Sequence, residues 1–474
     1  MKPAIILLAL TSIALAQGPL TPPGAPGLTM RSLDEIEPRI PLNQTTAPGD
    51  AASVYKITRP GSYILTGNLK PPAGHHGILI ALLVPGVVEV DMMGFTIDGS
   101  DAGPTASALC NNEVIAGALN FYKLRHGTIR GFAGTACLQA PGTAVTFVFQ
   151  DIAWLMNGAG VSTTGRLLMS DSSITGGTGI PIQMGSNSVL SGVEISGSGA
   201  VTSPLISTGD HCALERVSLS WSFGESNSGS AVMLGPDSTV SGLTARINGG
   251  TFSGPVLGNT SGFTEVSGLT LELLNVTAPS ASNSFSWGAT NPGLLGTTYG
   301  GDGQISAQNC TFTSAVVVMP PSPLGYLEND LITQLTGATT APSVVRVEAN
   351  NFTMNCDIFV AGTATVSGAV VDVAASGTTI RANIRGGSVG VRLSSGTGNT
   401  VEGCNLIGLL VPAQAIQITS GVTNSLVRNN RAARLPAGGV LVQNNGGPTN
   451  FIAPVLTSPA MLSANTNPFA NILH

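Results

Sequence analysis

A six-residue pattern recurs along the chain and constrains the fold more than any other feature. Its positions read apolar, polar, turn-forming, any residue, small or polar, and apolar. The clearest copies are Leu190–Ile195, Val240–Ala245, Val266–Leu271 and Val401–Leu406. Looser copies begin at Val90, Leu124, Phe149, Met169, Leu214, Ala307, Val347, Ile380 and Val427. Neighbouring copies are mostly separated by 20 to 26 residues, with larger gaps between 268 and 382.

The first and last positions of the pattern are both apolar, which a straight strand cannot place on one face because its side chains alternate. The chain must therefore turn a corner between them, and the third position is where we expect it. That residue is Gly, Asp or Asn in eight of the thirteen copies, and these types reach positive φ at the least cost. Each copy thus predicts a strand, a bend and a second strand.

Coils of this length with short strands predict an all-β chain folded as a single-stranded right-handed parallel β-helix, a solenoid in which each coil pairs with its neighbours. The composition agrees. Only 9% of residues are charged and 61 of 474 are Gly, while hydrophobic residues make up 42%. These values argue against disorder and against long exposed helices, whose solvated faces need Lys and Glu.

The N-terminal segment is expected to be a signal peptide covering residues 1–16. Lys2 precedes a short apolar run, and Ala14-Leu15-Ala16 has the small residues of a cleavage site, so that Gln17 would begin the mature chain. The alternative is an uncleaved anchor helix, but the run is shorter than the ~20 residues that span a bilayer. We therefore expect a secreted or cell-surface protein with no transmembrane segment after signal removal.

The remaining boundaries follow from turn signals and the repeat. Residues 17–49 predict a Pro-rich leader and residues 50–77 an N-terminal hairpin cap that turns at Pro60-Gly61. The parallel β-helix is expected over 78–445, with extended loops or degenerate coils around 268–349, and 446–474 is expected to be a C-terminal cap or tail.

These segments also resemble a known family. GPLTPPGAPGLTMRSLDEIEPRIPLN, ITRPGSYILTGNL, VEVDMMGFTIDG, NTVEGCNL, NSLVRNN and NPFANILH are similar to stretches of exported bacterial right-handed parallel β-helix repeat proteins, which are related in architecture to the pectate-lyase-like superfamily. The resemblance covers the whole chain and implies the fold. Its architectural relatives include polysaccharide lyases and hydrolases, adhesins and surface proteins, so the fold does not select an activity.

Several partners and cofactors are not expected. The net charge is −6 and no basic tract is present, which argues against nucleic acid. The six cysteines contain no C-x-x-C pair, so we expect no metal and no cofactor. In an exported protein some could form disulfides, and the alternative is that they are small buried hydrophobic residues.

A basic cluster is the best candidate for a binding site. Tyr122, Lys123, Arg125, His126 and Arg130 crowd one coil of a charge-poor chain. Lys123, Arg125 and Arg130 could bind an acidic glycan, with Tyr122 as a stacking platform. The alternative is ordinary surface charge, with Arg125 paired to Asp91 one coil away.

Catalytic carboxylates of a glycoside hydrolase lie about 5 to 9.5 Å apart, so they should occupy matching positions on neighbouring coils. The outward second positions contain no two adjacent acids, and Glu194 and Glu215 occupy unlike positions. The last four outward second positions, Glu348, Arg381, Glu402 and Arg428, alternate between negative and positive charge. They predict a stack of salt bridges that fixes the register between coils.

Other candidate chemistry is weaker. Asp91, Asp98 and Asp101 form the one local acidic group, His75-His76 lies in a Gly-flanked loop, and Gly209-Asp210-His211 reads first as a turn. The sequence therefore predicts an exported, non-catalytic protein of the cell surface or extracellular space that is structural or binds carbohydrate. The alternative is a polysaccharide lyase or glycoside hydrolase with its site in the loops, where Trp287, Tyr299 and Tyr326 could stack on sugars or simply pack.

Overall fold

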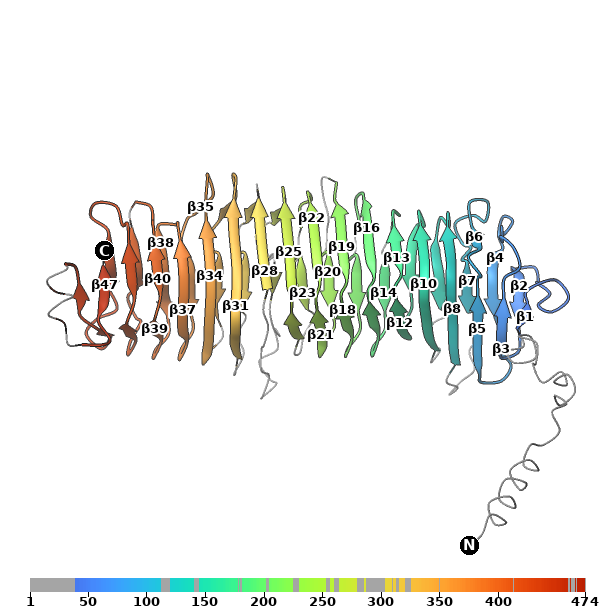
Figure 1. Cartoon of the computed structure of the whole chain (residues 1–474), viewed down its shortest axis with the longest axis horizontal. Coiled ribbons are helices and arrows are strands. Elements are labelled where there is room, and N and C mark those ends of the chain that lie inside the picture. Colours follow the sequence, from blue (N-terminus) through green and yellow to red (C-terminus); the bar gives the residue numbers. More distant parts are fainter. Residues whose placement is uncertain are drawn as a thin grey trace, which may run out of the picture. The chain divides into compact units, whose positions relative to one another are not determined.

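A computed structural model describes residues 39–111, 120–139, 145–177, 179, 181–201, 204–224, 230–252, 256–259, 264–278, 285–286, 303–308, 310–312, 315–319, 325–348, 350–411, 413–458, 461, 465 and 467–473. The chain divides into two units, residues 1–40 and 41–474. The expected signal peptide and most of the Pro-rich leader lie outside the described residues. In the second unit, parallel strands stack side by side as successive coils of a β-solenoid (Figure 1).

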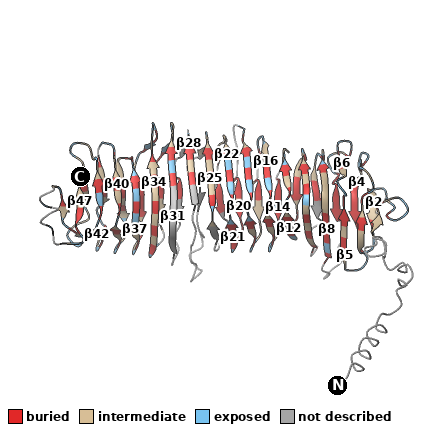
Figure 2. Ribbon diagram, in the orientation of Figure 1, coloured by how far each residue is buried: buried red, intermediate tan, exposed pale blue. Residues whose placement is uncertain are grey.

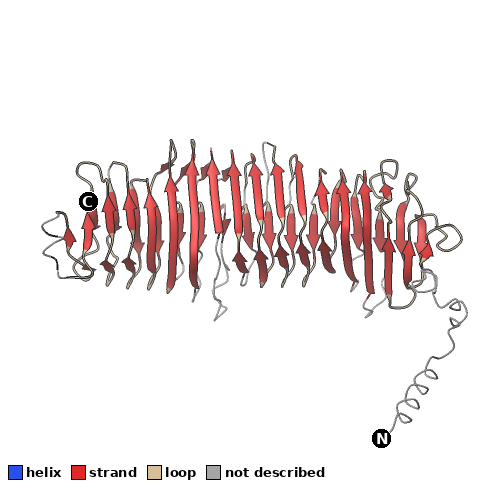
Figure 3. Cartoon of the chain, in the orientation of Figure 1, coloured by secondary structure: helices blue, strands red, loops and turns tan. Residues whose placement is uncertain are grey.

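Every element in the described part of the chain is a strand (Figure 3), and the strands fall into three parallel sheets. The largest sheet has 27 strands, usually two per coil: β1 (Ile40–Pro41), β3 (Gly61–Ile64), β5 (Val87–Asp91), β6 (Thr96–Asp98), β8 (Asn120–Arg130), β10 (Val145–Leu155), β12 (Arg166–Ser170), β13 (Ser173–Thr175), β15 (Val189–Ser191), β16 (Glu194–Ser198), β18 (Ala213–Glu215), β19 (Ser218–Ser222), β21 (Ser238–Ser241), β22 (Thr244–Asn248), β24 (Thr264–Ser267), β25 (Leu269–Leu274), β28 (Gly303–Gln308), β31 (Gly325–Thr336), β34 (Phe352–Val360), β37 (Thr379–Arg385), β39 (Thr400–Glu402), β40 (Asn405–Ile407), β42 (Leu426–Arg428), β43 (Arg431–Ala433), β45 (Phe451–Ile452), β46 (Val455–Leu456) and β47 (Asn471–Leu473).

The second sheet has 16 strands, one per coil: β2 (Ser53–Ile57), β4 (His76–Ile80), β7 (Leu109–Asn111), β9 (Thr135–Gln139), β11 (Ala159–Ser162), β14 (Ile182–Met184), β17 (Ile206–Thr208), β20 (Val232–Leu234), β23 (Leu257–Asn259), β27 (Phe285–Ser286), β30 (Val317–Met319), β33 (Val345–Val347), β36 (Ala369–Ala374), β38 (Val389–Ser395), β41 (Gln414–Ile418) and β44 (Val440–Asn444). A third sheet has four short strands: β26 (Thr277–Ala278), β29 (Thr311–Phe312), β32 (Thr340–Ala341) and β35 (Thr365–Val366). The parallel β-helix expected from the repeat is therefore confirmed.

The corners lie where the third position of the pattern predicts them. Nine of these residues have a positive φ of 49° to 74°: His126, Asp151, Asp171, Gly192, Arg216, Gly242, Gly268, Gly403 and Asn429. In the first copy the corner falls one residue later, at Met93. In the Ile380 copy there is no corner, because β37 runs straight through Ala382.

The coils also bend at other residues with positive φ, such as Met156, Asn187 and Asn275, and two copies of the pattern lie at corners of this kind. The Ala307 copy lies at the corner after β28, since Gln308 aligns with Leu274 and Thr336. The Val347 copy begins at the last residue of β33 in the second sheet, and the corner falls at its fifth residue, Asn351. The long gaps between copies of the pattern arise because these copies mark different corners of the coil. The strands β28, β31 and β34 themselves align coil by coil through this region.

The residue that follows a corner turns inward and is often polar. Its side chain accepts a hydrogen bond from the backbone N–H of the equivalent residue on the preceding coil. Examples are Ser172 from Ile152 (3.2 Å), Ser238 from Cys212 (3.3 Å), Asn399 from Thr378 (3.0 Å), Asn430 from Cys404 (2.9 Å) and Asn450 from Ser425 (2.9 Å). Since a buried N–H without a partner costs about 1–3 kcal/mol, these side chains hold the corners together.

Buried apolar side chains from the described coils fill the interior of the solenoid, and buried residues recur on its stacked strands (Figure 2). Near the N-terminal end, aromatic rings fill it. The ring centroids of Tyr122 and Phe147 are 5.7 Å apart, and those of Phe149 and Trp154 are 5.3 Å apart in an edge-to-face arrangement. Such contacts stabilise a core beyond the area that they bury.

The prediction of an N-terminal hairpin is wrong, because its two strands do not pair with each other. β2 pairs in parallel with β4 in the second sheet, while β3 pairs in parallel with β5 in the largest sheet. β2 and β3 therefore lie on the first coil, because the Pro60-Gly61 corner directs the chain from one sheet to another, and His76 and Gly77 begin β4 on the next coil. At the other end, β45 pairs with β42 and β47 with β43, so that the tail extends the solenoid.

Among the described residues, no helix has the length and apolar character needed to cross a bilayer.

Candidate functional site

The predicted basic cluster lies on β8, which bends at the αL residue His126. Lys123 and Arg125 precede the corner, and Arg130 ends the strand. β8 is paired with β5 and β6 on one side and with β10 on the other. The structure thus brings these residues to neighbouring positions on two faces of one coil.

Tyr122 does not belong to this surface. Its side chain is 2% exposed and contacts Phe147 inside the solenoid. The alternation of β8 places Tyr122 and Leu124 inward and Lys123 and Arg125 outward. Tyr122 therefore cannot serve as a stacking platform, and that part of the prediction is wrong.

The basic side chains are paired with acids on the preceding coil. Lys123 Nζ lies 3.4 Å from Glu89 Oε1, and Arg125 Nε lies 3.1 Å from the same oxygen and 3.2 Å from Asp91 Oδ2. Arg130 Nη2 lies 2.8 Å from Asp98 Oδ2. The cluster is thus charge-balanced, and the pairing of Arg125 with Asp91 is the alternative that the sequence left open.

Asp91 is the most buried acid of this group, with its residue 3% exposed. Burial acts to raise the pKa of its carboxyl group. The hydrogen bond from Met93 N–H (2.9 Å), the contact with His126 Nδ1 (3.2 Å) and the charge of Arg125 outweigh burial, so that the pKa lies below its ordinary value. Asp91 is therefore ionised at neutral pH and holds His126 and Arg125 in place.

One pair of neighbouring carboxylates was not predicted from the sequence. Asp151 and Asp171 occupy the same corner on adjacent coils, since Gln150 aligns with Ser170 and Ala153 with Ser173. Both are exposed and both have positive φ, 54° and 49°. Comparing third positions in the pattern, in addition to second positions, would have revealed them.

The other sequence candidates are dispersed. Asp101 pairs with Lys70 (2.8 Å), and the ring of His76 accepts a hydrogen bond from Ser107 N–H (3.0 Å). His211 is at a corner, 3.6 Å from Asp237. Among the described residues there is no group of three or more His, Cys, Asp or Glu side chains that could hold a metal ion.

The loop aromatics contribute little to the described structure. Trp287 and Tyr299 lie outside the described residues, and for Tyr326 only its place on the backbone of β31 is described. The expectation that they bind sugars stays a prediction.

The predicted salt-bridge stack is confirmed for three of its four members. Glu402 accepts hydrogen bonds from Arg381 Nη2 (2.5 Å) and from Arg428 Nη2 (2.7 Å), on the coils before and after it. Burial acts to raise the pKa of Glu402, and these two hydrogen bonds outweigh it, leaving the pKa below its ordinary value.

Glu348 is not part of this stack, contrary to the prediction. It follows β33 on a different sheet and pairs with Arg346 (2.7 Å). Arg346 and Arg392 flank Asp372 there, with N···O distances of 3.3 and 2.9 Å. The error arises because the Val347 copy of the pattern marks another corner.

All six cysteines lie among the described residues, and they are buried thiols without a disulfide: Cys110, Cys137, Cys212, Cys310, Cys356 and Cys404. Cys212 and Cys404 follow corners and lie at the inward positions that Ser or Asn occupies on other coils. Burial raises the pKa of Cys110 to about 11 and that of Cys404 to about 12. Of the two alternatives, the structure supports small buried residues.

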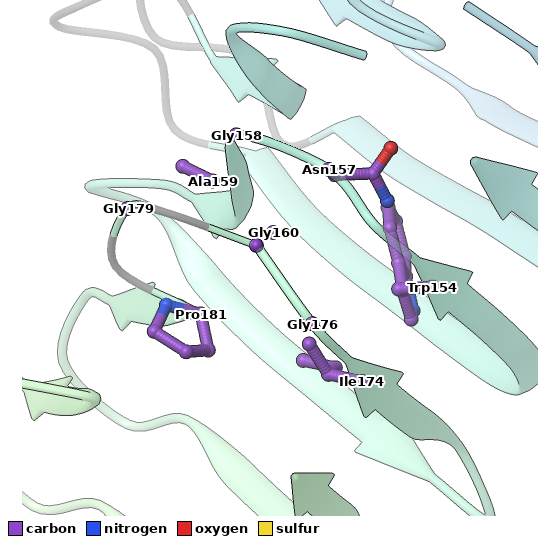
Figure 4. A pocket seen from close by; sticks show the side chains of 10 residues that line it. Trp154, Asn157, Gly158, Ala159, Gly160, Ile174, Gly176, Gly179 and Pro181 are labelled. Atoms are coloured by element: carbon purple, nitrogen blue, oxygen red, sulfur yellow. The ribbon is translucent and has the colours of Figure 1, made fainter. Parts of the chain in front are cut away.

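A hollow of about 10 Å³ lies between two coils, lined by Trp154, Asn157, Ile174 and Pro181 among others (Figure 4). Trp154 is fully buried, and its Nε1 has no hydrogen-bond partner among the described residues. This volume is close to the ~10–15 Å³ that one water molecule needs, so the hollow is too small for a sugar.

Comparisons of the chain with protein-family models, with curated proteins and with solved structures found no match.

Proposed function

We propose that this chain is an exported, non-catalytic β-solenoid of the cell surface or extracellular space, which acts as a durable rod or binds carbohydrate. The observation that carries the proposal is the pairing of charges between coils. In the clusters around Asp91, Asp372 and Glu402, acids and bases on neighbouring coils bind each other. Side chains used in this way reinforce the stack.

The proposed location rests on the signal-like N-terminus and on the resemblance to exported bacterial β-helix repeat proteins of pectate-lyase-like architecture. It is tested by expressing the full chain in a bacterial host, fractionating the cells and sequencing the N-terminus of the product. We expect an extracytoplasmic protein that begins at Gln17. A product that stays in the cytoplasm with Met1 intact would contradict export.

The non-catalytic role is tested by a glycan-array screen combined with assays for new reducing ends and for the 235 nm absorbance of lyase products. We expect no turnover of any polymer, with binding of a glycan as the positive outcome of the carbohydrate-binding version. Release of product from any polymer would contradict the proposal.

The second candidate is a polysaccharide lyase or glycoside hydrolase, and the aligned carboxylates of Asp151 and Asp171 favour it. Neighbouring coils are about 4.8 Å apart, which is near the separation of carboxylates in retaining glycosidases. If turnover is found, Asp151→Asn and Asp171→Asn should each abolish it, while Asp210→Asn, an exposed acid on another coil, should not.

A further inference from the structure

Positive charge accumulates toward the C-terminal end of an acidic chain. Residues 350–474 contain six Arg and three acidic residues, a net charge of 6 − 3 = +3, whereas the whole chain carries −6. The three acids are already engaged: Asp357 with Asn383, Asp372 with Arg346 and Arg392, and Glu402 with Arg381 and Arg428. The remaining arginines are Arg385, Arg431 and Arg434.

These three arginines are exposed, and no ion pair is found for them among the described residues; the guanidinium of Arg385 lies over the Phe359 ring, 5.7 Å from its centroid. Arg385 ends β37, Arg431 begins β43, and Arg434 is the αL corner residue just after β43. β40 lies between β37 and β43. The two strands are thus two coil spacings apart, or about 10 Å.

An exposed apolar segment lies between these arginines. Leu410 and Val411, 59% and 74% exposed, belong to the connection that follows β40. Leu410 N–H donates to Gly387 O (2.7 Å), two residues after Arg385, and Gly408 N–H donates to Ala433 O (3.0 Å), next to Arg434. The backbone therefore holds the apolar pair between the two coils that carry these exposed arginines.

We propose that this edge, formed by Arg385, Leu410, Val411, Arg431 and Arg434, docks the solenoid on an anionic lipid surface. Apolar side chains flanked by arginines match both parts of such a surface, because Leu and Val enter the acyl boundary while guanidinium groups bind phosphate. This goes beyond the proposed function by supplying a mode of surface attachment.

The same features argue against other anionic partners. Three exposed arginines are few for nucleic acid, whose binding proteins typically neutralise many phosphates. A soluble acidic glycan would engage the arginines but would leave Leu410 and Val411 in water. The combination of charge and exposed apolar surface therefore favours lipid.

The N-terminal end of the solenoid offers a matched control. Leu83 and Val84, 77% and 55% exposed, also form an apolar pair on a connection between strands. The basic residues Lys123 and Arg125 on the nearby β8 are paired with Glu89 and Asp91. Apolar exposure is thus similar at both sites, but the C-terminal edge adds three exposed arginines, whereas the N-terminal connection has one exposed arginine, Arg59, nearby.

The test is co-sedimentation of the mature chain with vesicles of phosphatidylcholine alone and with 30% phosphatidylglycerol. We expect binding to the anionic vesicles only, reduced by high salt. Arg385→Gln, Arg431→Gln and Arg434→Gln together should weaken it at least about tenfold, and so should Leu410→Ser with Val411→Ser. Arg246→Gln, which changes an exposed arginine paired with Glu272, and Leu83→Ser with Val84→Ser should have no such effect.

A second readout does not depend on sedimentation. Val411→Trp places an indole at the apolar tip, and its fluorescence should shift to the blue on anionic vesicles. Equal binding of all variants, binding to neutral vesicles, or an unshifted Val411→Trp emission would overturn the proposal. Displacement of the protein from vesicles by alginate at equal charge would overturn it in favour of an acidic glycan.

Discussion

Asn430 provides the sharpest test of how the corners are stabilised. Its side chain is fully buried after the corner at Asn429. Oδ1 accepts from Cys404 N–H (2.9 Å), and Nδ2 donates to Val401 O (3.0 Å). Asn430→Ala leaves the buried Cys404 N–H without this acceptor and removes the hydrogen bond to Val401 O.

The expected cost follows from these two hydrogen bonds. A buried N–H left unsatisfied costs about 1–3 kcal/mol and a further lost hydrogen bond about 0.5–1.5 kcal/mol, so we expect Asn430→Ala to lower the free energy of unfolding by about 3 kcal/mol. Equilibrium denaturation in urea measures the loss, and hydrogen exchange at the Cys404 amide should accelerate in parallel. Because solenoids can unfold in segments, the exchange measurement localises the effect.

Asn445→Ala is the matched control, since Asn445 is an exposed residue on the same part of the solenoid. Its effect should stay within about 0.5 kcal/mol, as is usual for surface substitutions. If Asn430→Ala costs no more than Asn445→Ala, or leaves the exchange of Cys404 unchanged, the inward side chains do not hold the corners.

Three further predictions address the charge stack, the corners and the thiols. Glu402 has a lowered pKa in the folded state, so its stabilising contribution is present at neutral pH and is lost as the pH falls through its ordinary range near 4.3 and below. Urea midpoints measured against pH should therefore converge for wild type and Glu402→Gln in acid, and a constant difference would contradict the ion-pair stack. Gly242→Ala, at φ 74°, should cost about 1–2 kcal/mol in the urea denaturation, while Gly67→Ala, which has open space at its Cβ and no positive φ, should cost less. The buried cysteines, with the pKa of Cys110 raised to about 11, should react with a thiol reagent only slowly in the native protein and fully after denaturation, and a fast native reaction would show that a thiol is accessible.

The sequence predicted the solenoid and many of its corners because both follow from local chemistry. Gly, Asp and Asn mark positive φ, and apolar residues on both sides of a corner must face one interior. The same local rule failed at Ala307 and Val347 because other corners of a coil use similar residues. A single-coil period does not show which corner a copy marks.

Contacts between coils were harder to predict than contacts within them. Lys123 looked like a free cation because Glu89, 34 residues earlier, becomes its neighbour only when the coils are stacked in register. The aligned acids at Asp151 and Asp171 were missed for a similar reason. The inward asparagines gave no sequence signal, since Asn430 resembles any turn residue until its burial is known.

The register between coils also bears on how such a chain can change in length. β15, β18 and β21 align residue for residue, so each coil presents the same pairing surface to its neighbours. Insertion or loss of one whole coil therefore leaves matched partners on both sides of the junction, whereas a shift by one residue would turn the core outward. Duplication within the gene can lengthen the protein in fixed steps of about 4.8 Å, each one compatible with the fold that it extends.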